Sequence, residues 1–368
     1  MRLLVVSHPA VLAVNQLPYA ALKARGWDPY IVVPARWRNE YSVGTFPPEV
    51  HPDLAGRVAG LRVALPGRQQ RHAYVTRLSR VIHDIGPDVV FIEEEPTSVP
   101  AVQWGFAARR AGVPFALQCD ENLDRHYPLP ARAFRRRNLD NAAFVAARSP
   151  AAAALVRSYA PGLRAPVIPH HVPAWPPIAR APADSLVVGY AGRLVPQKGL
   201  DVAIDAAAGL ERVALRFVGG GPLHDDLLAR AARRGTDLRI DPAVAHDGMP
   251  ATYARFDVLV LPSRATATWS EQFGRVLVEA LWCGVPVVGS DAGEIPWVIQ
   301  STGGGVLFPQ DDVGALREIL VRLRDDPAHR RELAARGREQ VQAQFSVEAV
   351  AGHLDAALRS AQRDASSS

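Results

Sequence analysis

The stretch FDVLVLPSRATATWSEQFGRVLVEALWCGVPVVGS, residues 256–290, decides the fold of the chain around it. It begins with the apolar run FDVLVLP, passes through a polar loop into FGRVLVEALWCG, and closes with the apolar run VPVVGS. Short apolar runs bounded by Pro and Gly predict buried strands, and the longer middle segment predicts a helix. A strand, a helix and a second strand in this order form one unit of a parallel sheet.

The same alternation continues on both sides of this stretch. The other predicted strands are RLLVVS (2–7), DPYIVVP (28–34), PDVVFIEEEP (87–96), PFALQC (114–119), SLVVGYAG (185–192) and VALRFVGG (213–220). The predicted helices are QLPYAALKARG (16–26), AVQWGFAARRAG (101–112), GLDVAIDAAAGL (199–210) and GPLHDDLLARAARRG (221–235), with a helical tail from about Val313. Strands that alternate with helices predict doubly wound α/β domains, which bind ligands at the carboxyl ends of their strands.

A proline-rich stretch, residues 160–184, separates the two runs of alternation. Dense proline opposes helices and central strands, so this stretch indicates an interdomain linker. The length of 368 residues suits two domains, and a hydrophobic content of 48% is typical of a soluble globular protein. No apolar run approaches the roughly 20 residues that span a bilayer, and the first residues lack the pattern of a signal peptide.

The cysteines and histidines do not form a pattern typical of a metal site. Cys119 and Cys283 lie far apart in the sequence, so we expect two buried thiols in a reducing cytoplasm rather than a disulfide framework. His170 and His171 are adjacent, but no third ligand stands at a convincing spacing. We therefore expect no metal and no cofactor.

The positive charge is concentrated in the first half. Residues 1–180 hold 22 Arg and Lys against 13 Asp and Glu, whereas the remainder holds 20 against 24. Such asymmetry predicts an anionic partner for the first half. Only Lys23 and Lys198 are lysines, which indicates a GC-rich, bacterial genome and makes Lys198 unusual in its segment.

Two glycine-containing segments follow predicted strands of the second half. In GYAGRLVPQKGLD (189–201), Gly192, Arg193 and Lys198 combine a flexible backbone with two cations, as a diphosphate requires. In FVGGGP (217–222), Gly220 and Gly221 would let the backbone approach a ligand closely. A solvated loop and a plain tight turn remain the alternatives. Neither segment is the GxGxxG pattern of a dinucleotide-binding dehydrogenase.

Two carboxylates, Glu271 and Glu279, frame the predicted helix of the third segment with seven residues between them. Glu271 lies just before the helix, near its positive end. Glu279 lies within the apolar run VLVEALW, where a carboxylate needs a partner. A sugar diol is one suitable partner, and an ion pair with Arg275 is the alternative.

Polar residues at the strand ends of the first half form a second candidate site. Glu93, Glu94 and Glu95 end one predicted strand, and they should raise one another's pKa if they are buried. A solvated strand end is the alternative. The segment QCDENLDRH ends another strand and offers Asp120, Glu121 and His126, although a histidine in a surface loop explains His126 as well.

The arginines of the first half include a cluster in RAFRRRNLD (132–140). If this segment is helical, Arg132, Arg135 and Arg136 share one face. We expect this face to bind an anionic membrane surface or a phosphate-bearing acceptor; a solvated arginine-rich face is the alternative. Aromatic residues do not alternate with these arginines, so nucleic acid is not an expected partner.

Taken together, the three segments of the second half resemble retaining GT-B glycosyltransferases of family 4. EQFGRVLVE matches the Glu-x7-Glu element of that family, GRLVPQKG resembles its diphosphate loop, and VGGGP resembles its second glycine turn. The resemblance implies two Rossmann-like domains facing a central cleft. It implies an acceptor-side domain at 1–165, a linker at 166–184, a donor-binding domain at 185–345, and a C-terminal helix at 346–368 that crosses back to the first domain.

The resemblance also implies a role for each matching residue. Arg193 and Lys198 would hold the diphosphate of a nucleotide sugar, Glu271 the transferred sugar and Glu279 the ribose. Backbone N–H groups at Phe273 and Gly274 would contact donor oxygens, and the backbone at Val244 would read the base.

On the acceptor side the chain departs from the family. Asn15 follows Val14 where many members carry a Gly-Gly loop, and Glu94 takes the place of a histidine before Glu-Pro. The later Gly-Gly-x-Pro-Glu element reads Gly293-Glu294-Ile295-Pro296-Trp297.

The expected function is metal-independent retaining transfer of a sugar from a nucleoside-diphosphate sugar to a hydroxyl of a glycan, glycolipid or secondary metabolite. The expected location is the cytoplasm, with peripheral contact to the inner membrane face. A sugar-nucleotide epimerase or a sugar phosphorylase of the same fold is an alternative enzyme. An anion- or nucleic-acid-binding protein is the non-enzymatic alternative.

Overall fold

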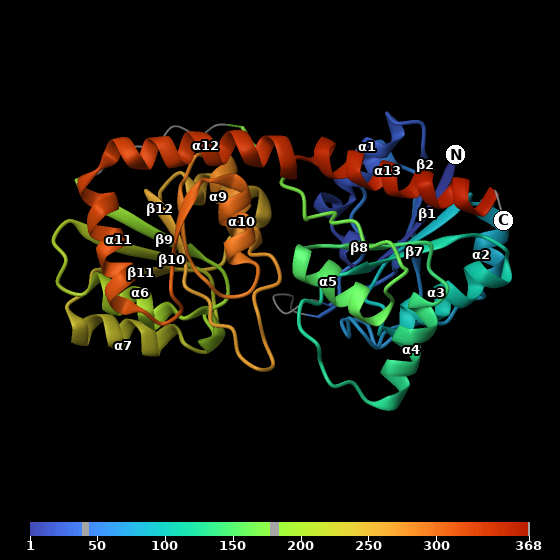
Figure 1. The fold of residues 1–368 in the computed structure, drawn as a ribbon, viewed down its shortest axis with the longest axis horizontal. Coiled ribbons are helices and arrows are strands. Elements are labelled where there is room, and N and C mark those ends of the chain that lie inside the picture. The colour runs from blue at the N-terminus through green and yellow to red at the C-terminus, as the bar shows by residue number, and fades with distance from the viewer. Residues whose placement is uncertain (39–43, 177–183, 367–368) are drawn as a thin grey trace. The chain divides into compact units, whose positions relative to one another are not determined.

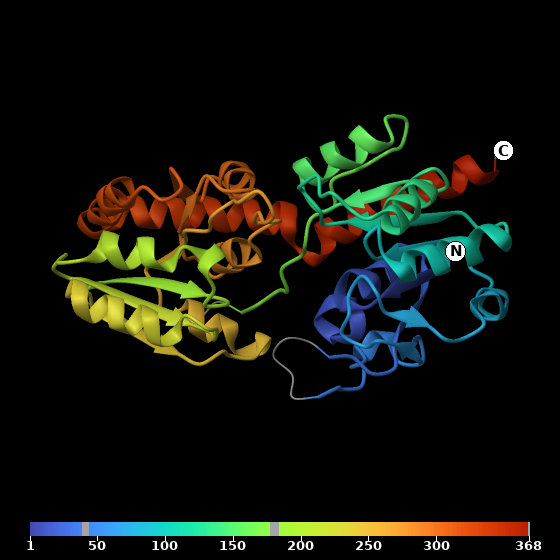
Figure 2. The ribbon, with the colours of Figure 1, turned by 90° about the horizontal axis from the view of Figure 1, so that it is seen from below.

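The computed structural model describes residues 1–38, 44–176 and 184–366 and divides the chain into two compact units. Unit 1 comprises Met1–Pro173 with Val347–Ser368, and unit 2 comprises Ala174–Ser346. In both views the strands of each unit lie between helices (Figures 1 and 2). Part of the predicted linker, residues 177–183, lies outside the described residues, so the linker boundaries stay a prediction.

Unit 1 contains a six-stranded parallel sheet in the order β3-β2-β1-β6-β7-β8. Its strands are β1 (Arg2–Ser7), β2 (Asp28–Pro34), β3 (Val58–Leu61), β6 (Val89–Glu93), β7 (Phe115–Cys119) and β8 (Val145–Ala147). The pairing register places Ser7 beside Glu93 and Cys119 beside Ala147. The residues that follow these four strands therefore emerge at one edge of the sheet. A separate antiparallel pair, β4 (Val63–Ala64) and β5 (Ala73–Tyr74), was not predicted.

Successive side chains of β1 pack on opposite faces of this sheet, as the period of a strand requires. Leu3 and Val5 belong to a core shared with α1 and α13, whereas Leu4 and Val6 belong to a core shared with α2, α3 and α5. Burial on both faces explains the continuous apolar sequence of the strand. The helices of unit 1 are α1 (Leu17–Lys23), α2 (Leu78–Ile85), α3 (Val99–Arg110), α4 (Leu129–Leu139), α5 (Pro150–Tyr159) and α13 (Val347–Ser366).

Unit 2 repeats the same strand order in a second parallel sheet, β11-β10-β9-β12-β13-β14. Its strands are β9 (Leu186–Ala191), β10 (Val213–Val218), β11 (Leu238–Asp241), β12 (Val258–Leu261), β13 (Val287–Ser290) and β14 (Gly305–Phe308). Its helices are α6 (Leu200–Ala207), α7 (His224–Arg234), α8 (Met249–Tyr253), α9 (Arg275–Trp282), α10 (Ile295–Thr302), α11 (Val313–Asp325) and α12 (Pro327–Phe345). The predicted pair of doubly wound domains is confirmed. The stretch at 256–290 forms β12, α9 and β13, as predicted.

Candidate functional site

The loops that follow β9 and β10 touch each other at the carboxyl edge of the unit 2 sheet. The backbone N–H of Leu194 donates to the carbonyl of Gly220 at 2.9 Å. A Cβ at Gly219 would lie 1.9 Å from the carbonyl oxygen of Gly192, and one at Gly221 would lie 2.4 Å from that of Leu194. Both glycines have φ near +150°. The glycine run is therefore required for contact between the two loops, whereas a Cβ at Gly220 would face open space.

Lys198 and Glu271 meet directly, although 72 residues separate them in the sequence. Lys198 Nζ lies 2.5 Å from Glu271 Oε2, and both side chains are largely shielded from solvent. Ser263, two residues after the end of β12, donates from its Oγ to the same carboxylate oxygen at 2.8 Å. Arg193 is half-buried in the same loop as Lys198, and its carbonyl accepts a hydrogen bond from Tyr190 at 2.7 Å. The structure thus brings the two predicted segments together.

Glu279 lies in α9 and is buried, as its apolar sequence context predicts. Its Oε2 accepts a hydrogen bond from the Tyr253 hydroxyl at 2.6 Å, and its Oε1 lies 3.4 Å from His246 Nε2. Burial and the neighbouring Glu279 charge raise the pKa of Tyr253 well above its usual value, so the phenol stays a donor. The partners anticipated from sequence were a sugar diol or Arg275. The structure adds Tyr253 and His246, which the sequence analysis missed.

The remaining predicted donor-site residues surround the start of α9. Gly274 has φ 74° and caps the helix, and Phe273 is buried with its ring against Trp297 and Phe345. The first N–H groups of a helix have no intrahelical acceptor, which suits them to bind anionic oxygens. Val244 is exposed in the segment that also carries His246.

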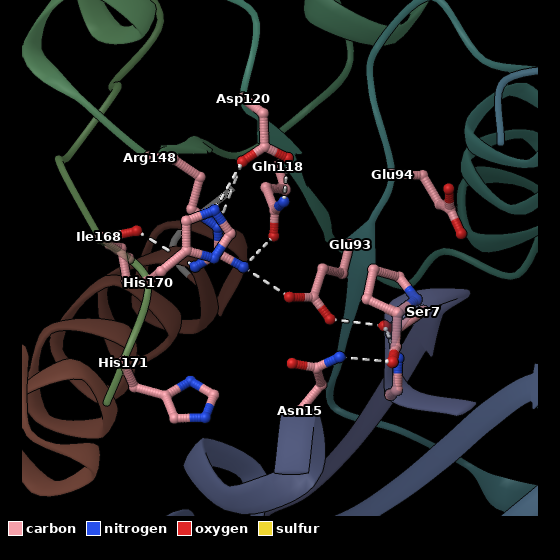
Figure 3. Close-up of polar contacts among 12 residues, drawn as sticks. Ser7, Asn15, Glu93, Glu94, Gln118, Asp120, Arg148, Ile168, His170 and His171 are labelled. Carbon is pink, nitrogen blue, oxygen red and sulfur yellow. Dashed lines mark hydrogen bonds and ion pairs between the residues drawn. The ribbon is translucent and has the colours of Figure 1, made fainter. Parts of the chain in front are cut away.

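In unit 1, a buried ion pair joins the ends of β6 and β8 (Figure 3). Arg148 Nη2 lies 2.5 Å from Glu93 Oε1 and also donates to Gln118. The other carboxylate oxygen of Glu93 accepts from Ser7 at 2.5 Å and from Tyr19 at 2.6 Å. The idea of a solvated strand end is wrong, because Glu93 and Glu94 are both buried.

Arg148 also holds the segment at residues 168–170, which follows α5 in the chain. Its Nη1 donates to the carbonyls of Ile168 and Pro169 at 3.2 and 3.4 Å. The next residue, His170, places Nε2 at 3.3 Å from Asp120 Oδ1 (Figure 3). Burial would raise the pKa of Asp120, but hydrogen bonding to His170 and the charges of His170 and Arg148 hold it well below its usual value. Asp120 is therefore ionised at neutral pH.

Glu94 forms a second buried cluster with two histidines. It accepts hydrogen bonds from the His8 backbone N–H at 2.9 Å and from His8 Nδ1 at 2.7 Å, and His72 Nε2 lies 3.7 Å from it. Burial opposes a charge on His8, but Glu94 outweighs it and raises the pKa of His8. Burial lowers the pKa of His72, and the nearby His8 charge adds to this effect. This pair of histidines was not predicted.

Unlike Glu93 and Glu94, Glu95 forms no ion pair with any residue that the structure describes. Its Oε1 accepts from the Asp120 backbone N–H at 2.7 Å, and its Oε2 is shielded from solvent. Burial, together with the charges of Asp120 and Glu121, raises the pKa of Glu95 well above its usual value. The carboxylates responsible are Asp120 and Glu121, which follow β7, and not the sequence neighbours Glu93 and Glu94 that the sequence analysis named.

The other acceptor-side predictions have different outcomes. Asn15 is half-buried, and its amide donates to the Pro9 carbonyl at 2.8 Å within its own loop. His126 is exposed, which is the expected position of a surface-loop histidine. His171 Nε2 lies 2.9 Å from the Val14 carbonyl. Among the described residues, no group of three or more ligating side chains could hold a metal ion. Both cysteines are free thiols, Cys119 buried and Cys283 partly exposed.

Two doubly wound units with the same strand order define the GT-B class of glycosyltransferases. The family described as "Glycosyl transferases group 1" matches residues 172–340, and that described as "Glycosyl transferase 4-like domain" matches residues 16–171. The chain belongs to the group 1 glycosyltransferases, as the sequence resemblance implied.

Curated relatives share part of this chain. A D-inositol 3-phosphate glycosyltransferase of Catenulispora acidiphila is 34% identical over 195 residues, which cover 49% of this chain and 45% of that protein. A GDP-mannose-dependent alpha-(1-6)-phosphatidylinositol monomannoside mannosyltransferase of Mycobacterium tuberculosis is 32% identical, covering 45% of this chain and 46% of that protein. The chain thus spans about half the length of the curated relatives it matches.

Solved structures match nearly the whole chain. Anabaena Alr3699/HepE in complex with UDP has a TM-score of 0.74 at 20% identity and covers 98% of this chain and 100% of its own. Sucrose-phosphate synthase from Thermosynechococcus elongatus has a TM-score of 0.71 at 21% identity, with 98% of each chain covered. At such identities the likeness establishes the fold. Within the described ranges, no helix has both the length and the apolarity to cross a membrane.

Proposed function

We propose that this protein is a retaining glycosyltransferase that moves a sugar from a nucleoside-diphosphate sugar to an acceptor hydroxyl. The observation that carries the proposal is the contact between Lys198 and Glu271 at the strand ends of unit 2. It joins a cation suited to a diphosphate with a carboxylate suited to sugar hydroxyls. Neither the family matches nor the relatives described above favour an epimerase, a phosphorylase or a nucleic-acid-binding protein.

In this proposal the residues of unit 2 divide the donor among them. Lys198 and Arg193 bind the diphosphate and stabilise the negative charge that develops as it leaves. Glu271 binds the transferred sugar, whereas Glu279 binds the ribose. Transfer is independent of a metal because these two side chains supply the positive charge. Phe273 and Gly274 offer backbone N–H groups to the donor, Val244 lies at the base, and Gly192, Gly220 and Gly221 form the adjoining loops.

In the proposal each of the two glutamates binds a different part of the donor, so substituting them one at a time tests it. We expect Glu279→Gln to weaken binding of UDP or GDP by about 10- to 150-fold, because a hydrogen bond to a charged group contributes about 1.5–3 kcal/mol. We expect Glu271→Gln to slow transfer while it leaves the affinity for the free nucleotide almost unchanged. Calorimetry with UDP and GDP measures the first effect, and release of nucleoside diphosphate from the donor measures the second. The reverse pattern would contradict the assignment.

The acceptor side of the proposal rests on unit 1. The relatives' names give D-inositol 3-phosphate and phosphatidylinositol monomannoside as what they act on, and both compounds carry phosphate. The excess of arginine in residues 1–180 is complementary to such an acceptor. We assign Asp120, Glu94 and Glu95, with Asn15 and His126, to the acceptor side of this domain. The location in this proposal is the cytoplasm, at the inner membrane face.

Helix α4 would carry the contact with an anionic membrane. It is helical as predicted, and Arg132, Arg136 and Arg137 are exposed on it. Arg135 differs because it is half-buried, with its guanidinium 3.4 Å from the centre of the Tyr159 ring, so it is held against α5. The three exposed arginines are therefore the ones to test, rather than the whole predicted cluster.

We expect a variant with serine in place of Arg132, Arg136 and Arg137 to bind anionic vesicles roughly 100-fold more weakly than the wild type. Each basic residue near an anionic leaflet contributes about 1 kcal/mol, and salt screens the attraction within about 8–10 Å. Co-sedimentation with vesicles of anionic and of neutral lipid, at low and physiological salt, measures the effect. The matched control changes three exposed arginines of unit 2, namely Arg233, Arg322 and Arg331, to Ser. Equal binding to neutral and anionic vesicles would contradict the membrane contact.

A further inference from the structure

Trp269 contacts the same ammonium group that Glu271 neutralises. Lys198 Nζ lies 5.2 Å from the centre of the Trp269 ring and 2.5 Å from Glu271 Oε2. Trp269 precedes Glu271 by two residues in the loop between β12 and α9, so one loop presents both an aromatic ring and a carboxylate to the cation. Tryptophan is the aromatic side chain that attracts a cation most strongly, and partial shielding of Lys198 from water strengthens this attraction.

Hydrogen bonds within the loop hold Trp269 in this position. The Thr266 hydroxyl accepts from the backbone N–H groups of Thr268 and Trp269 at 3.3 and 3.0 Å, and the Thr266 N–H donates to the Trp269 carbonyl at 2.7 Å. These bonds close a tight turn that fixes the backbone of Trp269.

Ion pairs tie the base of the loop to the segment that carries Lys198. Arg264 donates to both carboxylate oxygens of Asp201 at 2.8 and 2.9 Å, and it also pairs with Asp311 at 2.5 Å. Asp201 lies three residues after Lys198, at the start of α6. The loop and the lysine are therefore fixed to each other as well as to the sheet.

We propose that Trp269 is a positioning residue that holds the Lys198 ammonium in place for the donor diphosphate. This inference rests on the proposed function. Glu271 neutralises Lys198, and in that function its carboxylate turns to the hydroxyls of the transferred sugar. The Trp269 ring carries no net charge, so it attracts the ammonium while it leaves the positive charge for the phosphate oxygens.

Binding of UDP and GDP by calorimetry tests the role of Trp269, with the tighter nucleotide used throughout. We expect Trp269→Ala to weaken binding by about 2- to 30-fold, the range for a cation on a tryptophan ring. We expect Trp269→Phe to recover part of the loss. Site-specific replacement of Trp269 by tryptophans with one to four ring fluorines should weaken binding step by step, because fluorine withdraws the charge that attracts the cation without removing the ring. Thr268→Ala, an exposed change in the same loop, is the matched control and should bind as the wild type does.

Two results would overturn the inference: wild-type affinity in Trp269→Ala, or no trend along the fluorinated series. Lys198→Ala, measured in parallel, separates this inference from the proposed function. If Lys198→Ala weakens nucleotide binding and Trp269→Ala does not, only the role of Trp269 is wrong. If neither variant weakens binding, the proposed donor site is wrong as well.

Discussion

Replacing Lys198 by alanine should slow sugar transfer by about 10- to 150-fold. A hydrogen bond to a charged group contributes about 1.5–3 kcal/mol, and each 1.36 kcal/mol in the barrier is a tenfold change in rate. Lys198 is largely shielded from solvent beside Glu271. Water that enters after its removal therefore does not readily take over its contact with the diphosphate. Arg193→Ala should have a loss of the same order, since both cations face the same leaving group in the proposed function. Release of nucleoside diphosphate, at donor concentrations well below KM, measures the effect.

The chain offers a matched control for this substitution. Lys23 is the only other lysine and lies on the surface of α1, where its Nζ donates to the Asp53 carbonyl. Lys23→Ala should transfer sugar at the wild-type rate. Wild-type rates in Lys198→Ala would contradict the diphosphate assignment. The same assay in excess EDTA should retain its rate, and a complete loss that magnesium restores would contradict metal independence.

Replacing Arg148 by alanine should destabilise unit 1 by about 3–5 kcal/mol, the usual result of removing one partner from a buried ion pair. The change leaves the Glu93 carboxylate buried with the Ser7 and Tyr19 hydroxyls as its donors. It also frees the Ile168 and Pro169 carbonyls that Arg148 binds. Guanidinium denaturation followed by circular dichroism measures the loss. Arg157→Ala, an exposed arginine of α5, is the control and should change stability by less than about 0.5 kcal/mol.

A double-mutant cycle distinguishes the ion pair from a general loss of packing. If the charge of Glu93 is the cause, Glu93→Gln combined with Arg148→Ala should cost less than the two single changes added together. Strict additivity would mean that the two residues stabilise unit 1 independently. Wild-type stability in Arg148→Ala would show that the contact is unimportant for folding.

The strands and helices with long apolar patterns were predictable from the sequence. The segments RLLVVS and VALRFVGG correspond to β1 and β10, since each buries both faces in a parallel sheet. Short strands such as β8 and β11 were missed, because three or four residues are too few to show the period of a strand. Each of these short strands is held in its sheet by pairing with a longer strand, β7 for β8 and β10 for β11.

The candidate sites were predictable only in part, because local patterns identify single residues but not their contacts with residues far away in the sequence. Lys198 and Glu271 were identified individually, and the structure adds their contact. Arg148 was missed, although a charged residue directly after a buried strand is a signal that could have indicated it. The pairing of His8 with Glu94 links residues 86 positions apart and cannot be inferred from local spacing.

Helix α13 has a consequence for the order in which the chain can fold during synthesis. Its Val350, Leu354 and Leu358 complete the core that contains Tyr19 and Leu22 of α1, yet they are translated after the whole of unit 2. Unit 2 is contiguous, so it can close its core as soon as its own residues have been made. Unit 1 therefore exposes an apolar face while the residues of unit 2, Ala174–Ser346, are translated, which takes roughly 9–35 s at about 5–20 residues per second. Until α13 has been made, the apolar face of α1 lacks the helix that covers it in the folded unit, so unit 1 is completed only after unit 2 has been translated.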